Sequence, residues 1–444
     1  MFYQQAKHLG WRRYDQHVAI VDPMNNQLQV LAGPPAALWE ALAAPTSLEA
    51  AAKRFSELVK RQVAAPILRQ ALTPLVAKGL LVEGKTRAGL TAAREQPAAG
   101  RGYYIDDLFG GFYHQIQPYV YENQLLKADI EINAACNLRC VHCYISDYKD
   151  RDLMNFQEIC GLLDELAEVG VMFLNLTGGE MTLRRDFLDI IAAARARHFV
   201  VSILSNATRL SDDTLAELAR VPPGNVYVSL YGVSAATHEH ITDRPGTFDA
   251  TLHNVRRLRA LGIPVVLRYL IMRHNVADLA LLPDLADDLD CLYTTSSTLF
   301  VTDGPKEFLG EHRITDDQRA ELWAAGLLKP PAKGLCTAGK QRVRIDAKGN
   351  VYPCELLRMQ FGNLRQDSLV DIMSTQASLR HIEDIHSLPK TCSSCAKNQD
   401  CPRCPGLAYH EDGNVLQNSS LACQVTDAYQ RASATELVQL RVSR

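Results

Sequence analysis

Three cysteines stand close together in this chain, at Cys136, Cys140 and Cys143. With the spacing Cys-x3-Cys-x2-Cys directly after a predicted strand, three thiolates on one loop can each hold one iron of a four-iron cubane. The fourth iron then has no protein ligand and is open to chelation by a cofactor. A zinc knuckle is the alternative, but structural zinc sites use four ligands rather than three.

The remaining cysteines are unevenly spread over the 444 residues. Cys160 and Cys291 stand apart in apolar surroundings, where a packing role is expected. The others form a second group: Cys336, Cys354, Cys392, Cys395, Cys401, Cys404 and Cys423. Clustered thiols indicate metal or redox chemistry in a reducing compartment. Paired Cys-x2-Cys units also suit zinc ribbons, although seven cysteines are one short of two complete four-ligand sites.

Polar residues follow several predicted strands downstream of the three-cysteine loop. In chain order they are Gly178-Gly179-Glu180, Ser205-Asn206, Ser229 and Arg268. Glycines allow close approach of the backbone, and a carboxylate accepts hydrogen bonds from an ammonium group. A Gly-Gly-Glu triplet on its own is more often a turn, and a structural salt bridge is the alternative role of Arg268.

Alternating strands and helices between about residues 126 and 300 must position these groups. The strands are expected at 128–133, 171–176, 200–204, 226–230, 263–271 and 292–301. Helices are expected between them, at 156–169, 185–196, 212–220 and 248–261. This alternation predicts an α/β fold, a parallel sheet that curls into a partial (β/α)6 barrel of the TIM type. Functional groups should gather at the C-terminal ends of its strands.

Together, the cysteine loop, the glycine-rich triplet and the strand ends resemble the radical S-adenosylmethionine (SAM) superfamily. The resemblance implies a SAM-binding 4Fe–4S cluster on Cys136, Cys140 and Cys143. It implies SAM contacts from Gly178, Gly179, Glu180, Ser205, Asn206, Ser229 and Arg268. The implied activity is that of an oxidoreductase, in which SAM is cleaved to a 5′-deoxyadenosyl radical that removes hydrogen from an unactivated carbon.

The second cysteine group is similar to the SPASM domain, the auxiliary-cluster extension of radical SAM peptide-modifying enzymes. The resemblance implies an outer 4Fe–4S cluster on Cys392, Cys395, Cys401 and Cys423, and an inner one on Cys336, Cys354 and Cys404. Two residues, rather than the usual three, separate Cys401 from Cys404. The inner cluster would either take a substrate thiol on its open iron or be closed by another ligand, such as Cys291 or a carboxylate. Glu355 matches an acid that serves as a base in sulfatase-maturing relatives, and a supporting charge is its alternative role.

Residues 1–92 are expected to form a separate winged-helix-like α+β domain, followed by a linker at 93–125. Strands are expected at 11–14, 17–22, 27–31 and 80–82, and helices at 35–43, 47–60 and 66–78. The order resembles the PqqD-like recognition element of ribosomally synthesised and post-translationally modified peptides (RiPPs), which binds leader peptides. It implies strand addition at 27–31 beside the helix at 66–78. A DNA-binding winged helix is the alternative, since residues 1–95 hold 12 Lys and Arg against 7 Asp and Glu.

Composition narrows the setting. The net charge of −3 argues against a general nucleic-acid binder. No apolar stretch approaches the length of a membrane span, and the N-terminal residues lack a secretory pattern, so we expect a cytoplasmic protein without a membrane partner.

The resemblances predict a RiPP maturase with a leader-binding domain (1–92), a radical SAM barrel (126–330) and a SPASM domain (331–444). A Cys thioether of the sactipeptide or ranthipeptide type is the leading product. The alternatives are a carbon–carbon or carbon–oxygen cross-link, epimerisation, quinone-cofactor or sulfatase maturation, haem side-chain processing, and a non-catalytic peptide-binding scaffold. Expected cofactors are three 4Fe–4S clusters and SAM, and expected partners are the precursor peptide and a flavodoxin- or ferredoxin-type reductant.

Overall fold

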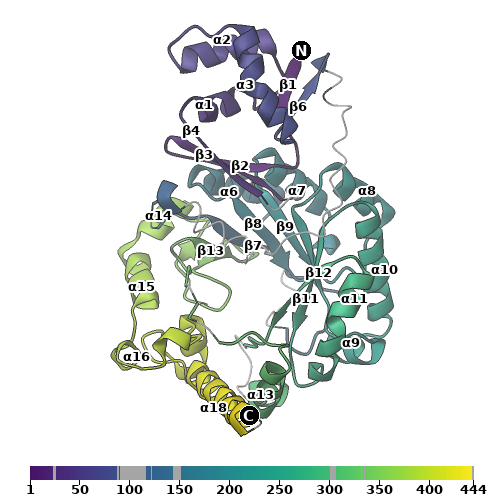
Figure 1. Ribbon diagram of the computed structural model, residues 1–444, viewed down its shortest axis with the longest axis vertical. Helices are drawn as coiled ribbons and strands as arrows, with labels where there is room; N and C mark the ends of the chain where they lie inside the picture. Colours follow the sequence, from purple (N-terminus) through teal and green to yellow (C-terminus); the bar gives the residue numbers. More distant parts are fainter. Residues whose placement is uncertain are drawn as a thin grey trace.

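The computed structural model describes residues 1–23, 27–87, 90, 117–121, 123–143, 152–300, 307–331, 333–334 and 336–442, with only the backbone at 117, 307 and 434–442. An α+β unit at the N-terminus, a barrel and a cysteine-rich C-terminal region follow one another along the chain (Figure 1). The predicted linker at 93–125 falls largely outside the described residues.

The barrel is a curved sheet of parallel strands with helices on its outer face (Figure 1). Its strands are β7 (Lys127–Asn133), β8 (Phe173–Gly178), β9 (Val200–Ser205), β10 (Asn225–Ser229), β11 (Val265–Leu270) and β12 (Leu292–Ser296). Its helices are α6 (Phe156–Glu168), α7 (Phe187–Ala196), α8 (Asp212–Arg220), α9 (Ala235–Thr242), α10 (Thr247–Ala260) and α11 (Leu282–Asp288). The predicted partial (β/α)6 barrel is confirmed, with α9 as an addition that the sequence pattern did not reveal.

Apolar and polar residues alternate along β7, which gives this strand two different faces. Its apolar residues lie in the main core between the sheet and the outer helices: Ala128, Ile130 and Ile132. Asp129 and Glu131 alternate with them and are buried on the opposite face, inside the barrel. The apolar face stabilises the sheet against the helices, while the interior face carries polar groups available for chemistry.

The N-terminal unit contains two small antiparallel sheets and three helices. One sheet has the order β5 (Thr46–Ser47), β1 (Phe2–Gln5), β6 (Leu81–Gly84), and the other β2 (Gly10–Tyr14), β3 (His17–Asp22), β4 (Gln27–Ala32). The helices are α1 (Pro34–Ala41), α2 (Leu48–Leu58) and α3 (Ala65–Ala77). Strands β1 and β5 were not predicted, because each is short and lacks a clear alternation.

This unit packs directly against the N-terminal ends of the barrel strands. Tyr14 and Val21 share one apolar cluster with Phe173 and Val200 of the barrel. The buried Arg12 donates from Nε to the carbonyl of Val171 (2.7 Å) and from Nη1 to a second barrel carbonyl (3.0 Å). The N-terminal unit therefore covers the floor of the barrel, the end at which its strands begin, through buried apolar and polar contacts.

Arg12→Met tests this interface. The substitution leaves two buried carbonyls without their cationic donor, so we expect the free energy of unfolding to fall by about 2–3 kcal/mol. Arg13→Met is the matched control, because Arg13 pairs with Glu40 on the exposed side of the same strand and should cost less than about 1 kcal/mol. Urea unfolding of both full-length variants measures the difference. Equal losses would contradict the described interface.

The C-terminal region extends the barrel sheet. Strand β13 (Arg342–Ile345) pairs in parallel with β7, and β14 (Asn350–Tyr352) and β15 (Gly362–Asn363) follow as antiparallel strands. The helices around and after them are α12 (Glu307–His312), α13 (Asp316–Ala324), α14 (Leu369–Ser374), α15 (Gln376–His386), α16 (Lys390–Ser393), α17 (Pro405–Leu407) and α18 (Ser420–Val442). The cysteine-rich region is thus joined to the barrel through one continuous sheet.

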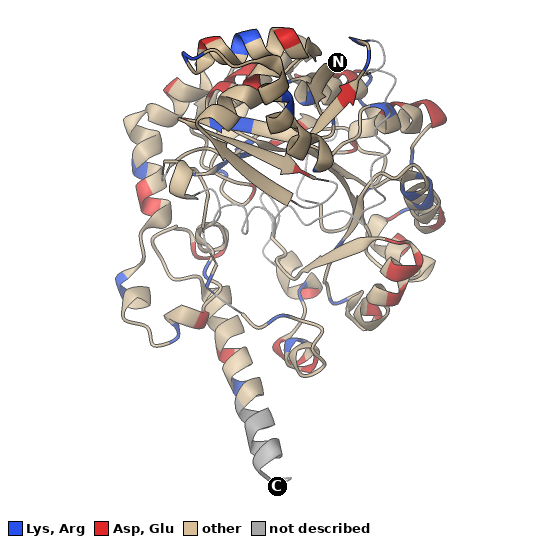
Figure 2. Cartoon of the chain, turned by 45° about the horizontal axis from the view of Figure 1, so that its top comes forward, with Lys and Arg blue, Asp and Glu red and all other residues tan. Residues whose placement is uncertain are grey.

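The charged residues are mixed in sign. In the view of Figure 2, Lys and Arg alternate with Asp and Glu over the outer helices, and the central strands carry few charges. Within the described part of the chain, no helix combines the length and the apolar character needed to cross a membrane.

Candidate active site

The three-cysteine loop follows β7 at the C-terminal edge of the sheet. Its backbone is tied to the end of α9, because Arg139 N donates to Thr242 O (3.3 Å) and Val141 N donates to Ile241 O (3.0 Å). Residues 144–151, which continue the loop, lie outside the described residues. Helix α9, absent from the sequence-based prediction, is therefore one support of the cysteine loop.

The thiols of this loop lie close enough to influence one another. Burial raises the pKa of Cys140 to about 12, and neighbouring Cys143 and Cys136 add to the rise. Burial also raises the pKa of Cys136, whose sulfur accepts a hydrogen bond from Leu138 N at 3.4 Å. Three thiols grouped in this way suit a cationic cluster, because iron binds the thiolates and releases their protons.

No three His, Cys, Asp or Glu side chains in the described ranges converge tightly enough to hold a single metal ion. A cubane places each thiolate on its own iron, and the three thiols of the loop would supply three of its ligands.

The glycine pair after β8 is required by packing against the cysteine loop. A Cβ on Gly178 would lie 2.1 Å from Asn133 O, and a Cβ on Gly179 would lie 2.2 Å from Ala135 O. Gly179 N donates to Asn133 O (2.7 Å) at this contact. The glycines thus let the end of β8 pass directly beneath the backbone that leads into the loop.

Glu180 is buried at the centre of a hydrogen-bond network. Its Oε1 accepts from the hydroxyls of Thr182 and Ser205, both at 2.8 Å, and its Oε2 accepts from Asn206 N at 2.8 Å. Burial raises the pKa of Glu180, and these donors oppose that rise. Glu180 therefore joins the ends of β8 and β9 and places Ser205 and Asn206 beside the glycine pair.

Asn137, inside the cysteine loop, links the loop to the end of β9. Its amide nitrogen donates to Thr208 Oγ1 (2.8 Å), and its amide oxygen accepts from Asn206 Nδ2 (3.0 Å). Neither Asn137 nor Thr208 was among the predicted site residues. The available signal was an amide residue between two cluster cysteines, since a loop that carries ligands needs supporting hydrogen bonds.

Ser229 and Arg268 lie side by side in register on β10 and β11. Arg268 is exposed, with its guanidinium carbon 5.7 Å from the centre of the Tyr227 ring. Nearby Tyr231 contacts His142 of the cysteine loop, with 4.5 Å between the ring centres. Burial raises the pKa of Tyr231, with Cys140 among the further causes. Ser229 and Arg268 thus lie together on neighbouring strands, and their predicted SAM contacts stay predictions.

The predicted inner cysteines come together around Glu355. Cys336 packs against Cys354 in one apolar cluster beneath the β13–β14 hairpin. Burial raises the pKa of Cys354 to about 12, and Glu355 adds to the rise. Burial likewise raises the pKa of Cys404, with further contributions from Cys336 and Glu355. Glu355 itself forms an ion pair with Arg342 at 2.5 Å.

The predicted outer cysteines form a second, more exposed group. Burial raises the pKa of Cys401, and Cys423 and Cys392 are among the further causes. Cys395 and Cys423 are exposed. The bonded Asp427 raises the pKa of Lys397, and the thiols of Cys395 and Cys423 add to that rise. Cys401, Cys423 and Cys392 thus influence one another, as Cys336, Cys354 and Cys404 do, and the assignment of each set to a cluster stays a prediction.

Cys291 lies elsewhere. It is 2% exposed in the main hydrophobic core, and its thiol donates to Leu289 O at 3.3 Å. The inner cysteines belong to a different apolar cluster. The alternative in which Cys291 completes the inner cluster is therefore wrong, and its packing role accounts for its position.

Two family models match the chain. The Radical SAM superfamily model covers residues 130–285, and the iron-sulfur cluster-binding domain model, SPASM, covers residues 336–396. These ranges contain the three-cysteine loop, the β8 and β9 ends, and the β13–β14 hairpin with most of the second cysteine group. The chain carries a radical SAM domain and a SPASM domain, and it is a radical SAM enzyme.

Several characterised proteins are similar in sequence. An AdoMet-dependent heme synthase of Methanosarcina barkeri is 24% identical over 65% of this chain and 93% of its own length. A mycofactocin maturase MftC of Mycobacterium ulcerans is 28% identical, with 61% of this chain and 80% of that protein covered. A PqqA peptide cyclase of Xanthomonas campestris is 24% identical, with 70% and 89% covered.

Solved structures share the fold. SuiB of Streptococcus suis bound to S-adenosylmethionine has a TM-score of 0.62 at 13% identity, with 95% of this chain and 100% of that chain covered. SuiB bound to the precursor peptide SuiA has a TM-score of 0.60 at 14% identity, with the same coverage. The domains imply 4Fe–4S clusters and SAM as cofactors.

Proposed function

We propose that the chain modifies a ribosomally made precursor peptide and forms a cross-link in it, with a Cys thioether as the leading product. The observation that carries the proposal is the continuity of the sheet from β7 to β13. One sheet therefore carries both the SAM-site loop, which follows β7, and the β13–β14 hairpin, which leads into Cys354. The proposed peptide would lie inside the barrel and extend from one to the other.

Three 4Fe–4S clusters are proposed, one on Cys136, Cys140 and Cys143 and two in the SPASM domain. When bound, the first cluster and SAM supply the 5′-deoxyadenosyl radical. The peptide carbon would give up a hydrogen atom to that radical, and the cysteine of the peptide would give up a proton. An oxidised auxiliary cluster held by the SPASM cysteines would accept the one electron released as the carbon–sulfur bond forms. The peptide thereby loses two hydrogen atoms per link.

The N-terminal unit is proposed to bind the leader of the precursor. Strand β4 is an edge strand of its sheet, and Lys78 at the end of α3 donates to Gln29 on β4 (3.3 Å). Ile67 on α3 is 62% exposed, which leaves an apolar side chain available to a peptide. An edge strand beside a partly apolar helix suits strand addition by an extended segment. The relatives named maturase and cyclase, and SuiB bound to SuiA, support a peptide substrate.

Mass spectrometry of a precursor co-expressed with the full chain tests this function. The expected result is a peptide lighter by the mass of two hydrogen atoms per link, with cysteine alkylation blocked where a thioether has formed. Co-expression with Cys140→Ala is the matched control and should leave the peptide unmodified. A cross-linked peptide with free cysteines would replace the thioether by a carbon–carbon or carbon–oxygen link. An unchanged mass with inverted stereocentres would indicate epimerisation instead.

Haem side-chain processing is the second candidate, favoured by the similarity to the heme synthase of Methanosarcina barkeri. The two functions differ in substrate, so one assay separates them. Reduced full-length enzyme with SAM is supplied with an iron porphyrin or with the precursor, and 5′-deoxyadenosine is measured. We expect stimulation by the precursor alone, and stimulation by the porphyrin alone would reverse the assignment.

A further inference from the structure

Arg342 stands between the barrel interior and the inner cysteine group. On the barrel side, its Nε donates to Asp129 Oδ2 of β7 at 2.9 Å. Its Nη2 lies 2.9 Å from the same Asp129 Oδ2 and 2.5 Å from Glu355 Oε2, so this nitrogen contacts both carboxylates. One guanidinium thus joins two carboxylates that lie 226 positions apart in the sequence, by the difference of their residue numbers.

Asp129 is a fixed anchor for this arginine. It is 5% exposed, and Asn175 Nδ2 donates to its Oδ1 at 2.6 Å. Burial alone raises the pKa of Asp129, but Arg342 and Lys127 outweigh that effect and lower it. Arg342 and Lys127 thus favour the ionised form of this carboxylate, and its hydrogen bond with Arg342 Nε fixes the orientation of the planar guanidinium.

Glu355 is the end of the chain of contacts that reaches the inner cysteines. It follows Cys354 directly, and its charge also influences Cys336 and Cys404. A second ion pair joins the two strands that carry Arg342 and Asp129, because Arg344 of β13 pairs with Glu131 of β7. Arg342 thus holds the Glu355 carboxylate at the junction of the barrel and the inner cysteine group, and Asp129 of the barrel in turn holds Arg342.

We propose that Arg342, anchored by Asp129, is a positioning residue that fixes the Glu355 carboxylate, and with it the inner cysteine group, at the position where the substrate thiol meets the peptide radical. This rests on the proposed function. Displacement of a reacting group by about 1 Å costs roughly 100-fold in rate. Loss of Arg342 should therefore slow trapping of the peptide radical without preventing SAM cleavage, so that 5′-deoxyadenosine is made without product.

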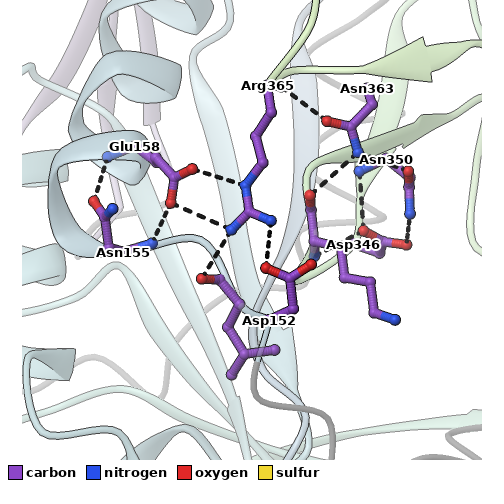
Figure 3. Close-up of polar contacts among 9 residues, drawn as sticks. Asp152, Asn155, Glu158, Asp346, Asn350, Asn363 and Arg365 are labelled. Carbon is purple, nitrogen blue, oxygen red and sulfur yellow. Dashed lines mark hydrogen bonds and ion pairs between the residues drawn. The ribbon is translucent and has the colours of Figure 1, made fainter.

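Arg365 supplies the matched control. It ties the same two regions together at the outer edge, where Nε donates to Glu158 Oε1 (2.7 Å) and Nη1 donates to Asp152 Oδ1 (2.6 Å) (Figure 3). These partners lie at and just before the start of α6, and none of them is part of the cysteine groups. Arg365→Met loosens the contact between the regions but leaves Glu355 and Arg342 untouched.

The test compares full-length, cluster-loaded wild type with Arg342→Met, Arg342→Lys, Asp129→Asn and Arg365→Met. The ratio of 5′-deoxyadenosine to modified peptide should rise about 10-fold or more in Arg342→Met, and it should stay at the wild-type value in Arg365→Met. Arg342→Lys should fall between, because an ammonium cannot bridge two carboxylates as a guanidinium does. Asp129→Asn should also raise the ratio, and this variant replaces Arg342→Met in the test if Arg342→Met does not fold.

A spectroscopic readout separates positioning from general loosening. The paramagnetic resonance signal of the reduced auxiliary clusters, recorded without peptide, should shift in Arg342→Met and not in Arg365→Met at equal iron content. An unchanged ratio and an unchanged signal in Arg342→Met would overturn the proposal, as would equal uncoupling in Arg365→Met. If wild type forms no product from any precursor, the proposed function fails. The positioning role is then tested by the resonance signal alone, and an unshifted signal in Arg342→Met would overturn it.

Discussion

Cys140→Ala is expected to abolish SAM cleavage by this protein. Cys140 lies at the centre of the three-cysteine loop, where burial and both neighbouring thiols raise its pKa. Mutation of a residue that only supports a metal ligand typically costs about 10–100-fold in metal affinity or activity. Loss of a ligand itself should therefore lower 5′-deoxyadenosine formation by more than about 100-fold. Anaerobic assay of the reduced enzyme with SAM measures this loss, and iron content should fall only by the share of the SAM-site cluster.

Cys160→Ala is the matched control for that experiment. Cys160 lies on α6 within the same domain and is half-buried, as Cys140 is. Its replacement removes a thiol but no predicted ligand, so both iron content and SAM cleavage should remain at the wild-type level. Retained SAM cleavage in Cys140→Ala, or equal loss in both variants, would refute the assignment of the loop.

Gly179→Ala should have the second-largest effect. The added Cβ would lie 2.2 Å from Ala135 O and 2.6 Å from Ala134 O, and both atoms belong to the backbone that enters the cysteine loop. Backbone cannot move aside as a flexible side chain does, so we expect about 1–3 kcal/mol of destabilisation. The displaced loop should also lower SAM cleavage by roughly 100-fold. Thermal unfolding and the 5′-deoxyadenosine assay measure the two effects.

Gly161→Ala is the control for adding a methyl group. Gly161 lies within α6, and a Cβ there meets nothing within 4 Å. Alanine in a helix interior is more favourable than glycine by about 0.5–1 kcal/mol, so this variant should be slightly more stable than wild type. Full activity and stability in Gly179→Ala would show that the close approach of β8 to the loop is not required.

The barrel strands were predictable because their apolar residues repeat on one face and helices separate them. Strand β13 was not predictable, because Arg342 and Arg344 make its sequence resemble that of an exposed segment. Both arginines are accommodated by acidic partners on β7, Asp129 and Glu131, more than 200 positions away. Such long-range charge pairing leaves no local pattern in the sequence.

The candidate site was predictable in its residue types but not in how they are used. The Cys-x3-Cys-x2-Cys spacing is local and therefore readable. Glu180 was predicted to bind the SAM ammonium group, whereas its carboxylate accepts hydrogen bonds from Thr182, Ser205 and Asn206. Folding brings these partners to Glu180, and it likewise packs Tyr14 on the floor of the barrel. The predicted SAM contact of Glu180 stays a prediction.

One iron of the SAM-site cluster should have no protein ligand and should bind the cofactor instead. Electron–nuclear double resonance of the reduced enzyme with SAM carrying ¹⁵N in its amino group and ¹⁷O in its carboxylate tests this directly. We predict hyperfine coupling of both labels to the cluster in wild type and none in Cys140→Ala. A wild-type cluster whose signal shows no coupling to either label would contradict the account.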